Sequence, residues 1–271
     1  MTDNLGKPIT EAVQKVLDNG STAVLITLIE AAANVGAKLL VSETGALAGS
    51  LGTAALDDAV AQFAVEFLRT HEEVRSFKVR DFAPALVDWA DAQLLFERIQ
   101  PEPRIVICGA GHVGAALARL ASLVGYRVTL IDDRAEFLSR DLFSSPLEQG
   151  IDLVVAEQWA EAVRAAIATG RGVSLAIVTR GHKQDEDCLR AAIAANPSYI
   201  GMIGSKRRTN IVLDKLREEG AYEEQLKKVR APIGLDIGAV SPEEVALAIL
   251  AEIVAERRGG SGGSLSRWRR D

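Results

Sequence analysis

The stretch Arg104-Ile-Val-Ile-Cys-Gly-Ala-Gly-His-Val-Gly114 joins a short apolar run directly to a glycine-rich turn. An amphipathic run over 115–123 follows the turn, and a second apolar run over 127–131 ends at Asp132. A strand, a glycine turn, a helix and a second strand that ends in an acid form the first unit of a dinucleotide-binding fold. The stretch therefore predicts an α/β domain with a Rossmann-like, doubly wound parallel sheet.

The three glycines of this turn have separate physical roles in such a unit. Gly109 permits a tight turn after the strand, Gly111 lets the backbone approach a phosphate group, and Gly114 lets the helix lie close to the sheet. The helix that begins near His112 directs its unpaired N–H groups and the positive end of its dipole at the phosphate. We therefore expect Gly109, Gly111 and Gly114 to bind a phosphate-bearing cofactor.

Strands and helices alternate through the rest of this region, which is typical of a parallel sheet with helices on both faces. Apolar runs predict strands over 104–108, 127–131, 151–156, 173–179 and 198–203. Amphipathic runs predict helices over 112–124, 159–169, 185–195, 205–219 and 242–257. The last of these helices has a strong start, Ser241-Pro242-Glu-Glu, with a capping serine and proline in the first turn.

The first hundred residues predict a smaller α+β domain. Its expected elements are helices over 7–17 and 57–68, strands over 23–29 and 36–41, a glycine-rich turn over 45–52, an edge strand over 73–80, and a helix or connector over 82–99. Pro101-Glu-Pro103 marks a boundary, because proline resists helix and favours extended chain. The predicted organisation is a small domain (1–100), a Rossmann-like domain (101–258) and a flexible glycine- and serine-rich tail (259–271).

The composition argues against several classes of protein. The chain has 31 basic and 37 acidic residues and a net charge of −6, so no overall basic field favours nucleic acid. Two cysteines, Cys108 and Cys188, are too few for a disulfide framework, which favours the cytoplasm. No cluster of histidine, cysteine and carboxylate has the spacing of a zinc site. No apolar run reaches the roughly 18 residues of a membrane span.

Polar residues follow the first two strands of the predicted sheet, at the edge where open parallel sheets bind ligands. Asp132 is the candidate to bind ribose hydroxyls, and the alternative is an ordinary solvated aspartate. Arg134 would either contact a 2′-phosphate or pair with Asp133, so NAD and NADP remain open. His112, within the glycine turn, would contact a phosphate or substrate, or would be a surface histidine with no role.

The sequence Thr-Arg-Gly-His-Lys, residues 179–183, follows the fourth predicted strand. Its guanidinium, imidazole and ammonium groups suit an anion or a pterin, and Arg180 and His182 are the candidates there. Asp185 and Asp187 are interpreted as caps of the helix that follows.

Two further loops complete the predicted edge. Residues 201–208 open a helix, where Gly204, the capping Ser205 and Lys206 would form an anion site, the alternative being a solvated basic helix start. Asp236 lies in the glycine-rich turn 232–238, where it would contact a ligand or bond to its own backbone.

Taken together, these motifs resemble the XdhC/CoxI family, accessory proteins for the maturation of molybdenum hydroxylases such as xanthine dehydrogenase. The motifs are Gly-Ala-Gly-His-Val-Gly (109–114), Ile-Asp-Asp-Arg (131–134), Thr-Arg-Gly-His (179–182), Tyr-Ile-Gly-Met-Ile-Gly-Ser-Lys-Arg-Arg (199–208), Ala-Pro-Ile-Gly-Leu-Asp-Ile-Gly (231–238) and Ser-Pro-Glu-Glu-Val-Ala-Leu-Ala-Ile-Leu-Ala-Glu-Ile (241–253). The resemblance implies that the protein binds and protects the molybdenum cofactor, a molybdopterin, and supports its sulfuration. It also implies delivery to an apo molybdenum hydroxylase, with a cysteine desulfurase as a further partner and a homodimer as the assembly.

The first domain departs from the pattern of this family. Ala-Ala-Ala-Asn-Val-Gly over 31–36 stands where the family usually has a Gly-Ser-Ser-Pro-like turn, and 49–57 keeps only two glycines and ends in Asp57. Fewer glycines restrict the backbone and its approach to a ligand. The resemblance therefore indicates a diverged N-terminal domain and assigns it no ligand.

Two other functions fit the same residues. An NAD(P)-dependent oxidoreductase would use the glycine turn for its cofactor and His112 or His182 as proton donor. The sequence lacks the tyrosine and lysine pair in helical register that many dehydrogenases use. An assembly factor that binds only its client hydroxylase is the other alternative. The leading interpretation is a cofactor chaperone that needs no catalytic residue.

Overall fold

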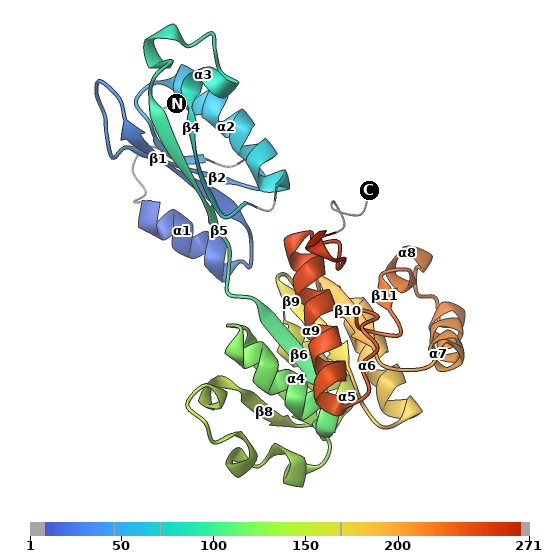
Figure 1. The fold of residues 1–271 in the computed structure, drawn as a ribbon. Helices are drawn as coiled ribbons and strands as arrows, with labels where there is room; N and C mark the ends of the chain where they lie inside the picture. Colours follow the sequence, from blue (N-terminus) through green and yellow to red (C-terminus); the bar gives the residue numbers. More distant parts are fainter. Residues whose placement is uncertain (1–8, 46, 71, 169, 267–271) are drawn as a thin grey trace. The chain divides into compact units, whose positions relative to one another are not determined.

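The computed structural model describes residues 9–45, 47–70, 72–168, 170–266. The chain forms two compact units, Met1–Pro101 and Glu102–Asp271 (Figure 1). Residues 267–271 of the predicted tail lie outside the described residues. None of the described helices combines the length and apolarity needed to cross a bilayer.

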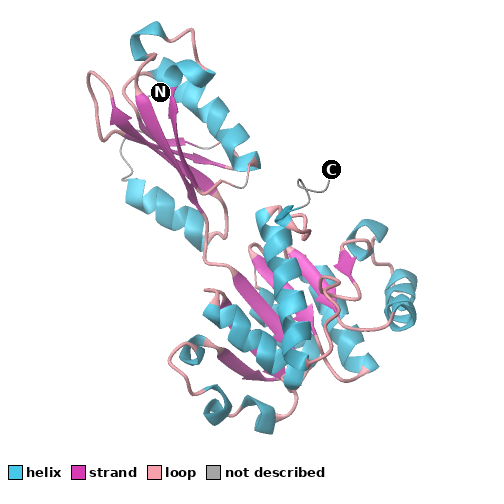
Figure 2. Cartoon of the chain, in the orientation of Figure 1, coloured by secondary structure: helices cyan, strands magenta, loops and turns pink. Residues whose placement is uncertain are grey.

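The first unit is a five-stranded antiparallel sheet with helices packed against it (Figure 2). The strands lie in the order β3-β2-β1-β5-β4, and every neighbouring pair is antiparallel. The elements are α1 Ile9–Asp18, β1 Ala23–Glu30, β2 Lys38–Ser42, β3 Leu47–Ser50, α2 Ala54–Arg69, β4 Val74–Lys78, α3 Val79–Phe82 and β5 Gln93–Ile99, with a short 3-10 turn at Val87–Trp89. The predicted edge strand is confirmed, because β4 lies at one edge of the sheet.

Two sequence predictions in this unit are wrong. Part of the expected glycine turn over 45–52 is strand β3, and the end of the expected helix or connector over 82–99 is strand β5, which lies between β1 and β4. Leu94 and Phe96 are fully buried two residues apart, which is the period of a strand. The consecutive apolar residues Leu94-Leu95-Phe96 hide that period in the sequence, because Leu95 is also partly buried.

The second unit is a six-stranded parallel sheet in the order β11-β10-β9-β6-β7-β8. Its elements are β6 Arg104–Cys108, α4 His112–Leu123, β7 Arg127–Asp132, β8 Asp152–Val155, α5 Trp159–Ile167, β9 Val173–Ile177, α6 His182–Ala195, β10 Tyr199–Met202, α7 Lys206–Glu218, α8 Glu223–Leu226, β11 Val229–Arg230 and α9 Pro242–Arg258, with 3-10 turns at Ala135–Leu138, Arg140–Phe143 and Glu148–Gly150. Counted from β6, this is the strand order of dinucleotide-binding domains, so the predicted doubly wound fold is confirmed. The chain winds away in opposite directions from β6 and β9, which lie side by side.

Helices cover both faces of this sheet, and each face has its own apolar core (Figure 1). Ile105 and Ile107 of β6 lie in one core with residues of α4 and α9. Val106 and Cys108 lie in the other core with residues of α5, α6 and α7. Successive residues of a strand point to opposite faces, so a fully buried strand requires the unbroken apolar run that the sequence shows.

The start of α9 follows its sequence prediction. The Ser241 hydroxyl accepts a hydrogen bond from the Glu244 amide, and the Glu244 carboxylate accepts one in return from the Ser241 amide. This capping box fixes where the chain turns from β11 into α9. It therefore positions the loop that carries Asp236.

Candidate functional site

The candidate residues lie on loops at the carboxyl ends of the parallel strands. His112 is the first residue of α4, His182 the first of α6, and Ser205 immediately precedes α7. Asp236 lies on the loop between β11 and α9. Because all six strands are parallel, these loops share one edge of the sheet. The loop of Asp236 follows β11, the edge strand of the sheet, and no polar contact among the described residues joins Asp236 to the other candidates.

The glycine turn lies where the winding direction of the sheet reverses. Gly109 has φ +110°, and a Cβ there would lie 2.7 Å from the Val178 carbonyl oxygen. A Cβ on Gly114 would lie 1.8 Å from the Gly109 carbonyl oxygen, so only glycine allows α4 to approach this closely. The tight turn and the close packing predicted for these two glycines are therefore confirmed.

Gly111 differs from its two neighbours. Its φ of −66° and ψ of −174° are open to any residue, and a Cβ there would meet nothing within 4 Å. The space beside Gly111 lies at the N-terminus of α4, where unpaired N–H groups and the helix dipole attract anions. The turn thus leaves open space beside Gly111 at the N-terminus of α4, and we call this space the cradle.

Asp132 is buried, with 1% of its surface exposed, and its carboxylate is fully engaged. It accepts hydrogen bonds from the Ala110 amide at 2.7 Å, the Arg134 amide at 3.0 Å, and the Arg134 Nε and Nη2 at 2.8 and 3.0 Å. Burial raises the pKa of Asp132, but the hydrogen bonds from Arg134 and Ala110 outweigh it and leave the pKa below its ordinary value. The alternative of a solvated aspartate is wrong, because Asp132 ties the glycine turn to β7.

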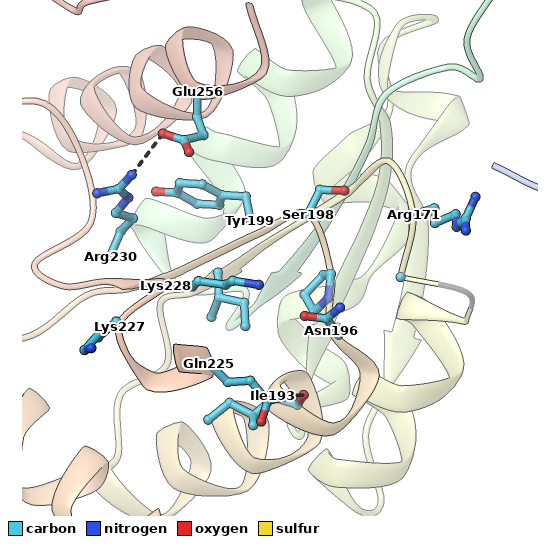
Figure 3. Close-up of a pocket in the computed structure, with 13 residues that line it drawn as sticks. Arg171, Ile193, Asn196, Ser198, Tyr199, Gln225, Lys227, Lys228, Arg230 and Glu256 are labelled. Atoms are coloured by element: carbon cyan, nitrogen blue, oxygen red, sulfur yellow. Dashed lines mark hydrogen bonds and ion pairs between the residues drawn. The ribbon is translucent and has the colours of Figure 1, made fainter. Parts of the chain in front are cut away.

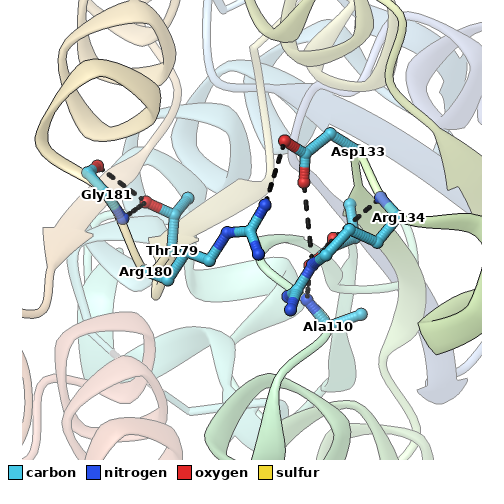
Figure 4. Close-up of polar contacts among 7 residues, drawn as sticks. Ala110, Asp133, Arg134, Thr179, Arg180 and Gly181 are labelled. Atoms are coloured by element: carbon cyan, nitrogen blue, oxygen red, sulfur yellow. Dashed lines mark hydrogen bonds and ion pairs between the residues drawn. The ribbon is translucent and has the colours of Figure 1, made fainter.

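Arg134 pairs mainly with Asp132, and its Nε lies 3.8 Å from the Asp133 carboxylate. Its guanidinium carbon also lies 3.9 Å from the centre of the Phe137 ring. Figure 4 shows Arg134 and Arg180 on either side of Asp133, which lies 3.8 Å from Arg180. The end of β7 is therefore connected electrostatically to the loop after β9.

Asp132→Asn is expected to lower the free energy of unfolding at pH 7 by about 2 kcal/mol, because hydrogen bonds to a charged group are lost. The wild-type pKa is depressed on folding, so this contribution is present above the ordinary carboxyl pKa of about 4 and is lost as the pH falls through the folded value. Urea unfolding from pH 7 to pH 3 should show the gap between the two proteins closing at the acid end. Asp133→Asn is the matched control, and an Asp132→Asn gap that stays constant with pH would contradict the assignment.

Asp185 has a structural role at the candidate site that the sequence did not predict. Helix α6 begins at His182 with Gly181 as its cap, so the expectation that Asp185 and Asp187 cap the helix is wrong. Asp185 is completely buried and accepts hydrogen bonds from Thr179 Oγ1 at 2.5 Å and from Arg208 Nη2. It thereby joins the loop after β9 to the start of α7.

Burial and the neighbouring hydrogen-bond donors shift the pKa of Asp185 in opposite directions. Burial raises the pKa of Asp185 above its ordinary value, and the Thr179 hydroxyl and the Arg208 guanidinium restrain that rise. The sequence gives little sign that Arg208, and not the neighbouring Arg207, is the partner of Asp185. The two arginines differ only in their position along the first turn of α7. Asp187, in contrast, remains partly exposed and pairs with Arg190 at 3.3 Å on the same helix.

The remaining candidates lie on the loops of this edge, and most of their described side chains are exposed. His112, Arg180, His182 and Asp236 all present their side chains to solvent. The predicted cap at Ser205 is confirmed, because its hydroxyl accepts a hydrogen bond from the Arg208 amide at 3.3 Å. The side chain of Lys206 lies outside what the structure describes. Gly204 immediately precedes this cap, and a Cβ there would lie 3.5 Å from the side chain of Arg208.

The arrangement is suited to holding an anion. It combines a helix N-terminus, a glycine that leaves room for a ligand, and exposed guanidinium and imidazole groups. No group of three or more histidine, cysteine or carboxylate side chains among the described residues could hold a metal ion. Cys108 and Cys188 are buried, and the pKa of Cys188 is raised by its hydrogen bond with Cys108 and by burial. Buried thiols are unreactive. The core position predicted for Cys108 is confirmed, because its side chain is buried.

Each of the two units matches a known protein-family model. The model of the XdhC Rossmann domain matches residues 105–253, and that of the XdhC and CoxI family matches residues 16–78. One similar structure, of a xanthine dehydrogenase from Bacillus halodurans, has a TM-score of 0.66 and 20% sequence identity. The similarity covers 92% of this chain and 66% of that one, and it shows that the two share a fold.

Three curated relatives are also similar in sequence. YqeB of Escherichia coli is 30% identical over 237 residues, which are 85% of this chain and 42% of that protein. A probable xanthine dehydrogenase subunit of Bacillus subtilis is 28% identical over 61% of this chain and 46% of its own length. The molybdenum cofactor insertion chaperone PaoD of Escherichia coli is 25% identical over 95% of this chain and 90% of its own length. The chain thus spans less than half the length of the first two relatives and most of the third.

Proposed function

The chain belongs to the XdhC and CoxI family, and from this membership and the geometry of the sheet edge we propose that it is a molybdenum cofactor chaperone. It would bind the cofactor, support its sulfuration, and insert it into an apo molybdenum hydroxylase of the xanthine dehydrogenase type. The similarity to PaoD over nearly its whole length supports the chaperone role. We further propose that it acts in the cytoplasm as a homodimer.

The open cradle at Gly111 is the observation that carries this proposal. The cofactor is a pterin that bears a phosphate, and the N-terminus of α4 would hold that phosphate beside Gly111. His112, Arg180 and His182 would contact the phosphate or the pterin from the neighbouring loops, and Ser205, Lys206 and Asp236 would extend the site along the edge. Gly109, Gly114, Asp132, Arg134 and Gly204 would act by fixing the shape of these loops.

Sulfuration requires a source of sulfur outside this chain. The two cysteines of the sequence are both buried in the Rossmann-like unit, and one holds the other by a hydrogen bond. A buried thiol is out of reach of a substrate and is therefore a poor sulfur donor. A cysteine desulfurase that docks on the loaded chaperone is therefore the proposed donor.

Binding of NAD(P) is the competing proposal, and the strand order favours it. In a dinucleotide site the acid at the end of the second strand binds the ribose hydroxyls. Here the carboxylate of Asp132 already accepts four hydrogen bonds, and Arg134 is committed to it. A ribose contact would have to displace Arg134, so the geometry favours a ligand held mainly by its phosphate.

The insertion step can be tested by reconstitution. Chaperone loaded with molybdenum cofactor is expected to activate an apo molybdenum hydroxylase to a greater extent than the same concentration of free cofactor. The Gly111→Leu variant should give no more than free cofactor, because leucine is sterically accepted there but fills the cradle. Lys38→Ala, on the first unit, is the control for handling and should behave as wild type. Equal activation by free and chaperone-bound cofactor would argue against the proposal.

A further inference from the structure

A cavity lies at the edge of the parallel sheet opposite to the glycine turn. Its volume is about 510 Å³, within the range of small-molecule sites. It is lined by residues of the α5–β9 turn, the end of α6, the start of β10, the α8–β11 segment and α9 (Figure 3). Tyr199, the first residue of β10, and Lys228, which immediately precedes β11, place it at the amino ends of these strands, away from the glycine turn.

The walls of this cavity combine apolar and cationic groups. Ile193, Pro197 and the ring of Tyr199 provide apolar surface. The Tyr199 hydroxyl donates a hydrogen bond to Glu252 Oε2 at 2.6 Å, and the same oxygen accepts the Gly234 amide at 2.7 Å. Tyr199 is therefore held in place from behind, as a rigid wall.

Lys228 is the cation that faces the cavity. Its side chain extends into the space between Tyr199 and Asn196 in Figure 3, and it forms no ion pair among the described residues. Arg230 lies at the rim and pairs with Glu256 at 3.1 Å on an exposed surface, where such a pair is weak. Arg230 balances the charge of Glu256, which also lines the cavity, so the ammonium group of Lys228 leaves a net positive charge that favours an anionic ligand.

The C-terminal ends of nearby helices explain the presence of some cations around the cavity, but they do not explain Lys228. α5, α6 and α8 end at this edge, and cations are favoured near helix C-termini. Arg171 and Lys227 fit that explanation, because both lie at the rim of the cavity with their charged ends directed outward in Figure 3, and Lys227 pairs with Glu224 at 2.9 Å. Lys228 is directed the other way, between apolar walls.

We propose that this cavity binds a small organic phosphate with a flat apolar body, of about the size of a nucleoside monophosphate. Lys228 and Arg230 bind the phosphate, and the Tyr199 ring and Ile193 contact the body of the ligand. The Ser198 hydroxyl, which accepts a hydrogen bond from the Gly172 amide, keeps its own proton free to donate to the ligand. This site is separate from the glycine turn, so the proposal does not depend on the proposed chaperone function.

Isothermal titration of the full chain with AMP, adenosine and inorganic phosphate tests the proposal. AMP is expected to bind with one site per chain, and adenosine and phosphate each at least about tenfold more weakly, because each offers half of the recognition. Lys228→Glu should weaken AMP binding by about tenfold or more. Lys227→Glu is the matched control, with the same charge change on a rim side chain whose charged end points outward, and it should weaken AMP binding far less than Lys228→Glu does.

The Gly111→Leu variant distinguishes AMP binding at the cavity from AMP binding at the glycine turn. AMP binding that is retained in Gly111→Leu and lost in Lys228→Glu supports the cavity. AMP binding that is lost in Gly111→Leu and retained in Lys228→Glu places the nucleotide at the glycine turn and overturns the proposal. An equal loss of AMP binding in Lys227→Glu and Lys228→Glu, or no saturable binding of AMP to wild type, overturns it as well.

Discussion

Gly114→Ala is expected to destabilise the Rossmann-like unit by about 3 kcal/mol, the upper range for overpacking of a tight interior. The added methyl group would lie 1.8 Å from the Gly109 carbonyl oxygen and 3.3 Å from Val178 Cγ2. A backbone atom cannot rotate away as a flexible side chain can, so α4 or the glycine turn must shift. Because the same turn shapes the cradle, cofactor binding should be lost together with stability.

The measurement for Gly114→Ala is urea unfolding followed by circular dichroism. Gly111→Ala is the matched control, since it adds the same methyl group three residues earlier into open space at an ordinary φ. That control should unfold within about 0.5 kcal/mol of wild type. If Gly114→Ala is as stable as Gly111→Ala, the close approach of α4 to the turn is not as the structure has it.

Asp185→Ala is the second substitution with a large expected effect. It removes the partner of the Thr179 hydroxyl and leaves the Arg208 guanidinium, four-fifths buried, without its counter-charge. Breaking a buried charged pair on one side costs about 3 kcal/mol or more. The loop after β9 and the start of α7 should also lose their fixed relation, so cofactor affinity is expected to fall by about tenfold.

The control for Asp185→Ala lies on the same helix. Asp187→Ala removes an identical side chain whose partner is a partly exposed arginine, and its effect should stay within about 0.5 kcal/mol. Urea unfolding and cofactor titration of the two variants test whether Asp185 contributes to both stability and cofactor affinity. A loss of stability for Asp185→Ala with unchanged cofactor affinity would show that the buried pair supports the fold alone and does not position the loops.

The Rossmann-like unit was predictable because its signals are local. The apolar run into Gly109, the capping Ser205 and the start Ser241-Pro242 each specify one strand end or helix end without reference to the rest of the chain. Strand β5 was not predictable in this way. Its identity depends on neighbours from elsewhere in the chain, β1 and β4, and on a phenylalanine, Phe96, that contacts four other phenylalanine rings.

The candidate site was predictable in position but not in its internal connections. Parallel strands bring the loops after β6, β9 and β10 to one edge, which the sequence order alone implies. Whether a carboxylate faces ligand or protein is decided by contacts between distant residues. Asp132 faces Arg134 and the glycine turn, and Asp185 faces a helix 23 residues further along the chain. The cavity around Lys228 was missed for the same reason, because its walls come from separate turns and helix ends.

Equilibrium binding of the molybdenum cofactor to the full chain tests the central proposal most directly. The cofactor should bind to wild type with one site per chain, and Gly111→Leu should bind at least about tenfold more weakly while its urea unfolding curve stays unchanged. NAD and NADP, titrated in parallel, should bind more weakly than the cofactor. Cofactor binding that is equal in Gly111→Leu, or tight NAD(P) binding without cofactor binding, would contradict a cofactor site at the glycine turn.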